Sequence, residues 1–457
     1  MSKKETKNEQ LAFEYGDRIR TAIDSGSLRP VQWRVIILCA FVAIIDGFDA
    51  QAIAFAAPDI ATEYSTSPAQ LGRLFSSALV GLMVGAFAMG PAADRFGRKP
   101  VIVVSCALMG VFSLAVAFAG SIEQLMLYRF LTGLGLGGAM PNVNVLTSEY
   151  APARSRAFWM TVMFAGFPLG AVAGGFASAA LIVEFGWRSI FVVGGVVPLI
   201  LVPVLIFFLP ESPHIISHDD SNSIRLKRLA AQLGVSLTPG ATANSEMQRN
   251  GVTQRRGRFM DLFGKRTGLT LAVWSVFLLN LLIVYTFMNW LPSVMKTAGL
   301  SLQTAIYTGV IFNAGGVIGG ILIAMLIDRG GAKRTLAISF AMGAGATSLI
   351  APSISIVPLL FVAIFFAGWA FVGSQFGLNA LVTRLYPDAV RSTGLAWALA
   401  AGRIGAIIGP IATGEFIARD WSLTAVFISI ASLSIICSIT VILLPIRREL
   451  HHDAAKT

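Results

Sequence analysis

The sequence predicts an all-α integral membrane protein in which twelve transmembrane helices form two pseudo-symmetric six-helix bundles. Three observations support this: the composition is strongly apolar, the apolar residues come in long blocks, and the blocks repeat at a fixed offset. Of 457 residues, 55% are hydrophobic and 13% are charged, whereas a soluble domain usually carries about a quarter charged residues. Many blocks reach the ~20 residues that cross a bilayer core.

The apolar blocks divide the chain into five regions. We expect a cytoplasmic tail (1–31), a first bundle (32–209), a cytoplasmic central loop (210–266), a second bundle (267–445) and a second cytoplasmic tail (446–457). The twelve predicted spans are 32–57, 69–93, 99–119, 122–147, 157–182, 187–209, 267–292, 303–327, 334–352, 355–382, 393–415 and 421–445. Residues 1–30 are polar and lack the apolar core of a secretory leader.

The basic residues predict the orientation. Most of the 35 Lys and Arg residues fall in the tails, the central loop and alternate short turns, which places these segments inside the cell by the positive-inside rule. The net charge of +11 is therefore an orientation signal and does not indicate a nucleic-acid partner. We expect a multi-pass protein of the bacterial cytoplasmic membrane with both termini in the cytoplasm.

The cysteines and histidines do not predict a metal centre. Cys39, Cys106 and Cys437 lie inside apolar blocks, and the four histidines lie in the central loop and the tail. We expect no metal, no cofactor and a monomer.

The two halves repeat at an offset of about 235 residues. The turn Asp94–Lys99 recurs as Asp328–Lys333. Further matches in the same order are Gly85 with Gly319, Asn142 with Asn379, Tyr150 with Tyr386, Gly174 with Gly409, Trp187 with Trp421, and Pro210 with Pro445. Parallel six-helix repeats predict a site near the midplane between the halves, an arrangement that suits a rocking transporter.

Three segments resemble the major facilitator superfamily: the turn Gly90–Lys99, the helix-four stretch Arg129–Gly138, and Pro210–Pro213. The resemblance covers essentially the whole chain. It implies the major facilitator fold and transport by alternating access.

A narrower resemblance is to the aromatic acid:proton symporters. It is carried by Asp46–Asp49, Asn289–Pro292, Gln375–Ala380, Arg391–Gly394 and Gly402–Gly405. It implies import of a small aromatic carboxylate of the benzoate or hydroxybenzoate type together with protons, in support of aromatic catabolism. It does not select one acid.

Asp46 and Asp49 are the acidic residues deepest in a predicted span, and they lie three residues apart on one helix face. A charge at the bilayer centre costs about 2.5–3.5 kcal/mol on insertion scales, so each one calls for a reason. Two nearby carboxylates in a low dielectric resist double ionisation. We expect both to carry protons; a hydrogen-bonded structural pair beside Gly47 is the alternative.

Arg129 and Arg403 are the basic counterparts. From helical rise, Arg129 lies at a depth similar to that of Asp46 and is assigned to proton coupling with the two acids. Arg403 lies near the midplane and is assigned to the substrate carboxylate, because a guanidinium recognises a carboxylate bidentately. The two roles could be exchanged, and either arginine could instead be satisfied by backbone carbonyls.

An aromatic ring needs flat apolar walls and an amide for a ring hydroxyl. The residues predicted to supply them are Asn144, Tyr285, Asn289, Trp290, Gln375 and Asn379.

Charged residues at the inner rim are assigned to gating, because opposite charges there can pair in one state and separate in the other. They are Asp94, Arg95, Arg98, Glu149 and Arg154 in the first half, and Asp328, Arg329 and Arg391 in the second.

The run Gly133-x-Gly135-x-x-Gly138 fits a dinucleotide-binding pattern, but it lies in mid-helix with no preceding strand. Close helix packing explains it better, as it does the pairs Gly81/Gly85, Gly170/Gly174, Gly316/Gly320 and Gly405/Gly409.

Two rival functions remain at this stage. One is a proton-coupled exporter of drugs or aromatic compounds, and the other is a membrane receptor that binds aromatic acids without transport. An enzyme is not expected, because the sequence offers no catalytic cluster.

Overall fold

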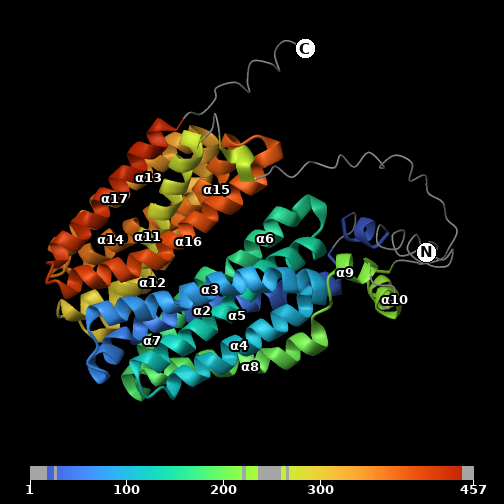
Figure 1. Ribbon diagram of the computed structural model, residues 1–457, viewed down its shortest axis with the longest axis horizontal. Helices are drawn as coiled ribbons and strands as arrows, with labels where there is room; N and C mark the ends of the chain where they lie inside the picture. Colours follow the sequence, from blue (N-terminus) through green and yellow to red (C-terminus); the bar gives the residue numbers. More distant parts are fainter. Residues whose placement is uncertain (1–17, 25–27, 219–222, 235–258, 264–266, 445–457) are drawn as a thin grey trace, which may run out of the picture. The chain divides into compact units, whose positions relative to one another are not determined.

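The computed structural model describes residues 18–24, 28–218, 223–234, 259–263 and 267–444, and these residues form helices joined by short turns (Figure 1). The long helices of the first half are α2 (Pro30–Glu63), α3 (Pro68–Phe96), α4 (Arg98–Ala117), α5 (Ile122–Tyr150), α6 (Arg156–Phe164), α7 (Gly166–Phe185) and α8 (Arg188–Phe208). Two short helices follow, α9 (Pro213–His218) and α10 (Ser223–Gln232).

The second half repeats this pattern. Its helices are α11 (Thr267–Thr297), α12 (Leu302–Gly330), α13 (Ala332–Ile350), α14 (Val357–Gly368), α15 (Ser374–Leu385), α16 (Asp388–Ala418) and α17 (Leu423–Leu443). Within the described ranges, eleven helical stretches are long and apolar enough to cross a membrane. α5 is the twelfth long helix; it is less apolar because it carries Arg129, Asn142, Asn144 and a run of glycines. The predicted fold class is confirmed.

Two predicted spans are interrupted. The span 157–182 divides at Ala165 into α6 and α7, and the span 355–382 contains a π-helical turn, Trp369–Gly373, between α14 and α15. A π-helical turn inserts a residue into the helical register and is common at functional sites. It directly precedes Gln375, one of the predicted site residues.

The described residues form two compact units that do not coincide with the sequence halves. One unit takes its residues from Met1–Ala50, Val80–Gly174 and Arg188–Val252, and the other from Gln51–Leu79, Gly175–Trp187 and Thr253–Thr457. In the second unit, α3 packs on α16 through Gly72, whose Cβ would lie 2.6 Å from the Pro410 carbonyl oxygen, and Ser76 Oγ donates to the Ile407 carbonyl at 2.7 Å.

The sequence repeat is visible in backbone detail within each unit. Gly97 and Gly331 occupy equivalent positions before α4 and α13, and both have a positive φ, 105° and 82°. Two residues later, Lys99 Nζ donates to the Ile206 carbonyl at 2.6 Å and Lys333 Nζ donates to the Leu444 carbonyl at 2.9 Å.

The glycine pairs pack helices into backbone contact. A Cβ at Gly81 or Gly85 would lie 2.0 or 2.2 Å from a carbonyl oxygen of α5, and one at Gly137 of α5 would lie 2.1 Å from the Leu82 carbonyl oxygen. Gly170, Gly405 and Gly409 likewise face carbonyl oxygens of neighbouring helices within 2.5 Å. Gly174, Gly316 and Gly320 instead face side chains of neighbouring helices. In the run that fits a dinucleotide pattern, Gly135 and Gly138 also pack tightly, against Ser105 and Met89.

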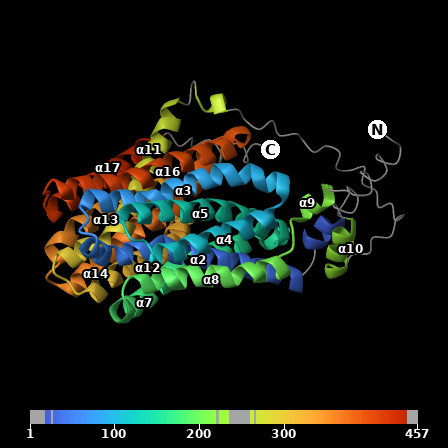
Figure 2. The same ribbon diagram turned by 60° about the horizontal axis from the view of Figure 1, so that its bottom comes forward.

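The helical segment 18–24 packs with α9 and α10 at one end of the first unit (Figures 1 and 2). Ile19 and Ile23 are buried in one apolar cluster with Leu226 and Leu229. Arg156 at the start of α6 donates to Asp24 at 2.7 Å and ties this segment to the bundle.

Candidate transport site

An ion pair between α2 and α5 is the most buried charged feature of the first unit. Arg129 Nη1 donates to Asp49 Oδ2 at 2.8 Å and to Oδ1 at 3.0 Å, and Nη2 donates to the Asp49 backbone carbonyl at 3.2 Å. The side chains are 1% and 2% exposed. The pair brings together two of the three residues assigned to proton coupling.

The packing of α2 on α7 orients the Asp49 side chain toward α5. A Cβ at Gly47 would lie 1.9 Å from the Phe167 carbonyl oxygen, so α2 meets α7 backbone to backbone on that face. Asp49 is two residues further on, about 200° round the helix, and faces the opposite side. Asp46, one turn before Asp49, is buried as well, at 3% exposure.

Removing one member of such a pair is costly, because the other charge is left buried without compensation. Proton uptake by Asp49 would likewise leave the buried charge of Arg129 without its counter-ion. The pair can therefore couple a proton to a rearrangement of the charged side chain on α5.

A second polar cluster lies in the second unit, on α11, α15 and α16. Asn280 Nδ2 donates to Gln375 Oε1 at 2.8 Å. Arg403 Nη1 and Asn379 Oδ1 are buried atoms without a hydrogen-bond partner. The guanidinium nitrogen can donate a hydrogen bond to a polar ligand, and the amide oxygen can accept one from it.

Arg403 lies at the level of Asn280. Its neighbour Gly402 packs on α11, where a Cβ would lie 2.6 Å from Leu281 Cδ1 and 3.2 Å from the Phe277 carbonyl oxygen. Asn280 lies between these two residues in the sequence, so the arginine of α16 and the amide pair share one depth of the unit.

Three of the other predicted ring-contact residues lie further along α11: Tyr285, which is half-buried, Asn289 and Trp290. Trp290 is ten residues from Asn280, about 15 Å along α11; its Nε1 donates to the Pro410 carbonyl at 2.9 Å, and its ring packs on Phe75 with centroids 5.3 Å apart. Asn289 Nδ2 donates to the Tyr285 carbonyl of its own helix at 2.8 Å. Trp290 and Asn289 thus have donors engaged in helix packing.

Asn144 is separated from the ion pair. It lies fifteen residues after Arg129 on α5, about 22 Å along the axis, and its Oδ1 is buried without a hydrogen-bond partner. The assignment of Asn144 to the substrate ring stays a prediction.

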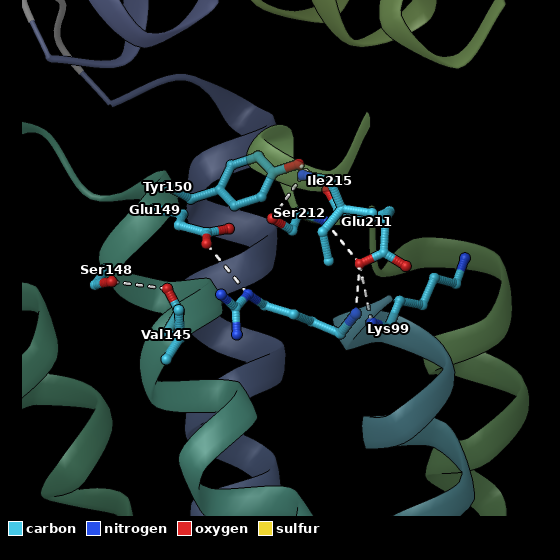
Figure 3. Close-up of polar contacts among 9 residues, drawn as sticks. Lys99, Val145, Ser148, Glu149, Tyr150, Glu211, Ser212 and Ile215 are labelled. Atoms are coloured by element: carbon cyan, nitrogen blue, oxygen red, sulfur yellow. Dashed lines mark hydrogen bonds and ion pairs between the residues drawn. The ribbon is translucent and has the colours of Figure 1, made fainter. Parts of the chain in front are cut away.

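Two of the predicted gating residues form a contact at the end of α5. Arg98 Nε lies 3.1 Å from Glu149 Oε1, with side chains 16% and 19% exposed (Figure 3). Asp94 is exposed, and the Arg95 guanidinium lies over the Phe96 ring at 5.3 Å. Arg154 is exposed, and Arg156 rather than Arg154 makes the ion pair with Asp24. In the second half, Asp328, Arg329 and Arg391 are exposed.

Glu211 completes this network and was not among the predicted site residues. Its Oε1 accepts from the backbone N–H groups of Arg98 at 2.8 Å and Lys99 at 3.1 Å, at the N-terminus of α4 (Figure 3). A carboxylate is favoured there by the unpaired N–H groups and the helix dipole. Tyr150 Oη donates to the Glu211 carbonyl at 2.8 Å. The conserved spacing of the repeat could not reveal Glu211, since its equivalent position in the second half is Ile446.

The network belongs to one half of the repeat. Arg98, Glu149 and Glu211 correspond to Ala332, Leu385 and Ile446, so all three charges are replaced by apolar residues together.

Repeated six-helix halves, a buried ion pair in one unit and an unpaired arginine donor in the other are typical of a membrane transporter. Comparison with known proteins supports this class and narrows it. The profile of the Major Facilitator Superfamily matches residues 39–353 and 273–457. The chain is 37% identical over 405 residues to the 4-hydroxybenzoate transporter PcaK of Pseudomonas aeruginosa, covering 88% of this chain and 90% of that one.

Other relatives have similar coverage. The gallate transporter of Pseudomonas putida is 35% identical, covering 90% of this chain and 91% of its own, and the benzoate transport protein of Acinetobacter baylyi is 33% identical, covering 94% and 93%. Among solved structures, the D-xylose–proton symporter matches with a TM-score of 0.70 at 17% identity over 91% of this chain and 98% of that one.

The chain therefore belongs to the major facilitator superfamily, within its aromatic acid transporters. It is a transporter and not an enzyme.

Proposed function

We propose that this protein imports an aromatic carboxylate of the benzoate or hydroxybenzoate type by proton symport, through alternating access. The buried Asp49–Arg129 ion pair carries the proposal. An acid held next to an arginine inside a membrane helix bundle is an expected element of a proton relay. Asp46, one turn away on the same face, is the second proton carrier.

Arg403 is proposed to hold the substrate carboxylate. Its Nη1 is buried without a partner, which favours an anionic ligand at that position. The Gln375 and Asn379 amides suit ring hydroxyls. Relatives that are transporters of 4-hydroxybenzoate, gallate and benzoate support this substrate class.

Proton coupling also answers an energetic difficulty. Moving one charge across 100 mV is worth about 2.3 kcal/mol, so an anion entering a negative interior is opposed. One proton per monoanion cancels that cost, and two protons make uptake electrogenic.

We further propose that the protein works as a monomer in the bacterial cytoplasmic membrane with both termini in the cytoplasm. The distribution of Lys and Arg residues supports this orientation.

Uptake by proteoliposomes under an imposed pH gradient tests the proposal. With acid outside, labelled 4-hydroxybenzoate, gallate or benzoate should accumulate inside, and collapse of the gradient with a protonophore should abolish accumulation. Expulsion of the acid under the same gradient would identify an exporter. Binding without counterflow would identify a receptor, and either result would overturn the proposal.

A further inference from the structure

Asn280 has a chemical environment that helix packing does not explain. It lies on α11 between the apolar residues Leu279 and Leu281, and it is 0% exposed. Its Nδ2 donates to Gln375 Oε1 at 2.8 Å, while its Oδ1 is buried without a hydrogen-bond partner. A buried amide with one group unsatisfied is costly, so its retention calls for a reason.

The partner amide lies where a ligand can reach it. Gln375 is half-buried, whereas Asn280 is fully buried. Gln375 is the second residue of α15, two residues after the end of the π-helical turn Trp369–Gly373. Because its Oε1 is engaged by Asn280, Gln375 keeps its Nε2 donor for another acceptor. If both side-chain amides rotated by 180°, Gln375 Nε2 would donate to Asn280 Oδ1, and Gln375 Oε1 would be the group left for the ligand. The pair therefore suits a hydroxyl, which can both donate and accept a hydrogen bond.

Two further unpaired groups lie at a similar depth of the same unit, on α15 and α16. Arg403 shares the depth of Asn280 through the packing of Gly402 on α11. Asn379 follows Gln375 by one turn on the same face of α15, and its Oδ1 is buried and unpaired, as is Arg403 Nη1. A cationic donor and a set of amides are thus available to one small polar ligand from three helices of the same unit.

We propose that Asn280 is a positioning residue that sets selectivity for the ring hydroxyl of the substrate by holding the Gln375 amide in place. The proposal rests on the proposed function, in which Arg403 holds the carboxylate. Asn280 does not touch the ligand. A hydroxylated ring satisfies the free group of Gln375, whereas an unsubstituted ring leaves it unpaired in a low dielectric. The pair therefore favours hydroxybenzoates over benzoate.

Competition measurements in proteoliposomes test this inference. In the wild type, 4- or 3-hydroxybenzoate should compete with labelled substrate better than benzoate does, by roughly five- to a hundredfold. Asn280→Leu should bring that ratio close to one while the inhibition constant of benzoate changes less than about threefold. Gln375→Leu should have the same effect, and the double variant should add nothing further, because the two residues act as one unit.

Asn313→Leu is the matched control. Asn313 is also a buried asparagine, at 3% exposure on α12, but its Nδ2 donates to Gly309 of its own helix at 2.9 Å. It should leave the ratio unchanged. Should Asn280→Leu fail to fold, Gln375→Leu at a half-buried site carries the test alone.

The outcomes separate this inference from the proposed function. Equal weakening of benzoate and hydroxybenzoate in Asn280→Leu would show a purely structural role and overturn the inference. A wild-type ratio near one would do the same while leaving aromatic acid transport intact. No transport of any aromatic acid by the wild type would instead refute the proposed function.

Discussion

Arg129 reaches both carboxylate oxygens of Asp49 with a single nitrogen, Nη1, at 2.8 and 3.0 Å, and reaches the backbone carbonyl of the same residue with the other. The carboxylate, and not only the helix, therefore orients the guanidinium. Loss of the negative charge on Asp49 removes the main partner of a buried cation.

Asp49→Asn should abolish proton-driven accumulation in proteoliposomes, because the pair no longer exchanges a proton. It should also destabilise the protein by about 3–5 kcal/mol, since Arg129 is left buried without its counter-ion. The double variant Asp49→Asn/Arg129→Gln should recover much of that stability in thermal unfolding but not the accumulation.

Asp46→Asn should likewise abolish accumulation. Asp59→Asn, near the C-terminal end of the same helix, serves as the control. If both Asp46→Asn and Asp49→Asn still concentrate substrate, the coupling assignment is wrong.

Arg403→Lys should raise the KM for aromatic carboxylates by about ten- to a hundredfold, because an ammonium cannot form the bidentate contact of a guanidinium. Uptake kinetics over a range of substrate concentrations measure this. Arg419→Lys, at the exposed end of the same helix, should leave the KM unchanged. An unchanged KM in Arg403→Lys would mean that Arg403 does not bind the substrate carboxylate. Arg129 would then be assigned to it, which is the alternative that the sequence leaves open.

Gly97→Ala should lower the melting temperature more than Gly331→Ala does. Both glycines combine a positive φ with an extended ψ, a conformation that costs a non-glycine residue about 1–3 kcal/mol. At Gly97, the new Cβ would also meet the Glu211 carboxylate, so that carboxylate must leave the α4 N-terminus; at Gly331 nothing lies within 4 Å. Thermal unfolding in detergent measures both melting temperatures. An equal decrease for the two variants would show that Glu211 does not contribute to the effect at Gly97.

Gln51→Met should stabilise the protein, whereas Gln32→Met should destabilise it. Both glutamines are buried, at 0% and 1% exposure. Both polar atoms of the Gln51 side chain lack a partner, while Gln32 donates to the Tyr150 carbonyl at 2.7 Å and accepts from Arg29 N–H at 2.9 Å. Replacing an unsatisfied amide with a thioether of similar length should gain about 1–3 kcal/mol. A lower melting temperature for Gln51→Met would mean that this amide is satisfied in the membrane.

The fold could be predicted from the sequence because bilayer-spanning blocks leave few alternatives to helices. Helical rise placed Arg129 at the depth of Asp46, but it did not specify that Asp49 is the carboxylate that Arg129 contacts. The breaks near Ala165 and at Trp369–Gly373 were not predicted. Gly166 and Pro168 follow the first break, and Gly368 precedes the second, but proline also occurs inside the unbroken helices α2, α3 and α8, so these residues do not mark a break by themselves.

Asn280 and Glu211 escaped prediction for a different reason. Asn280 is one amide in a long apolar block, and its role depends on Gln375, which is 95 residues away. Glu211 depends on the N-terminus of α4, 113 residues before it. Such contacts are set by which helices become neighbours, which the sequence pattern of a single helix does not specify.

The Arg98–Glu149 contact gives the first half of the repeat an ion pair that the second half lacks, because the equivalent positions are Ala332 and Leu385. Dissolved salt screens a partly exposed ion pair, whereas two apolar side chains offer no charge to screen. Ionic strength at this end of the helices therefore acts unequally on the two duplicated halves.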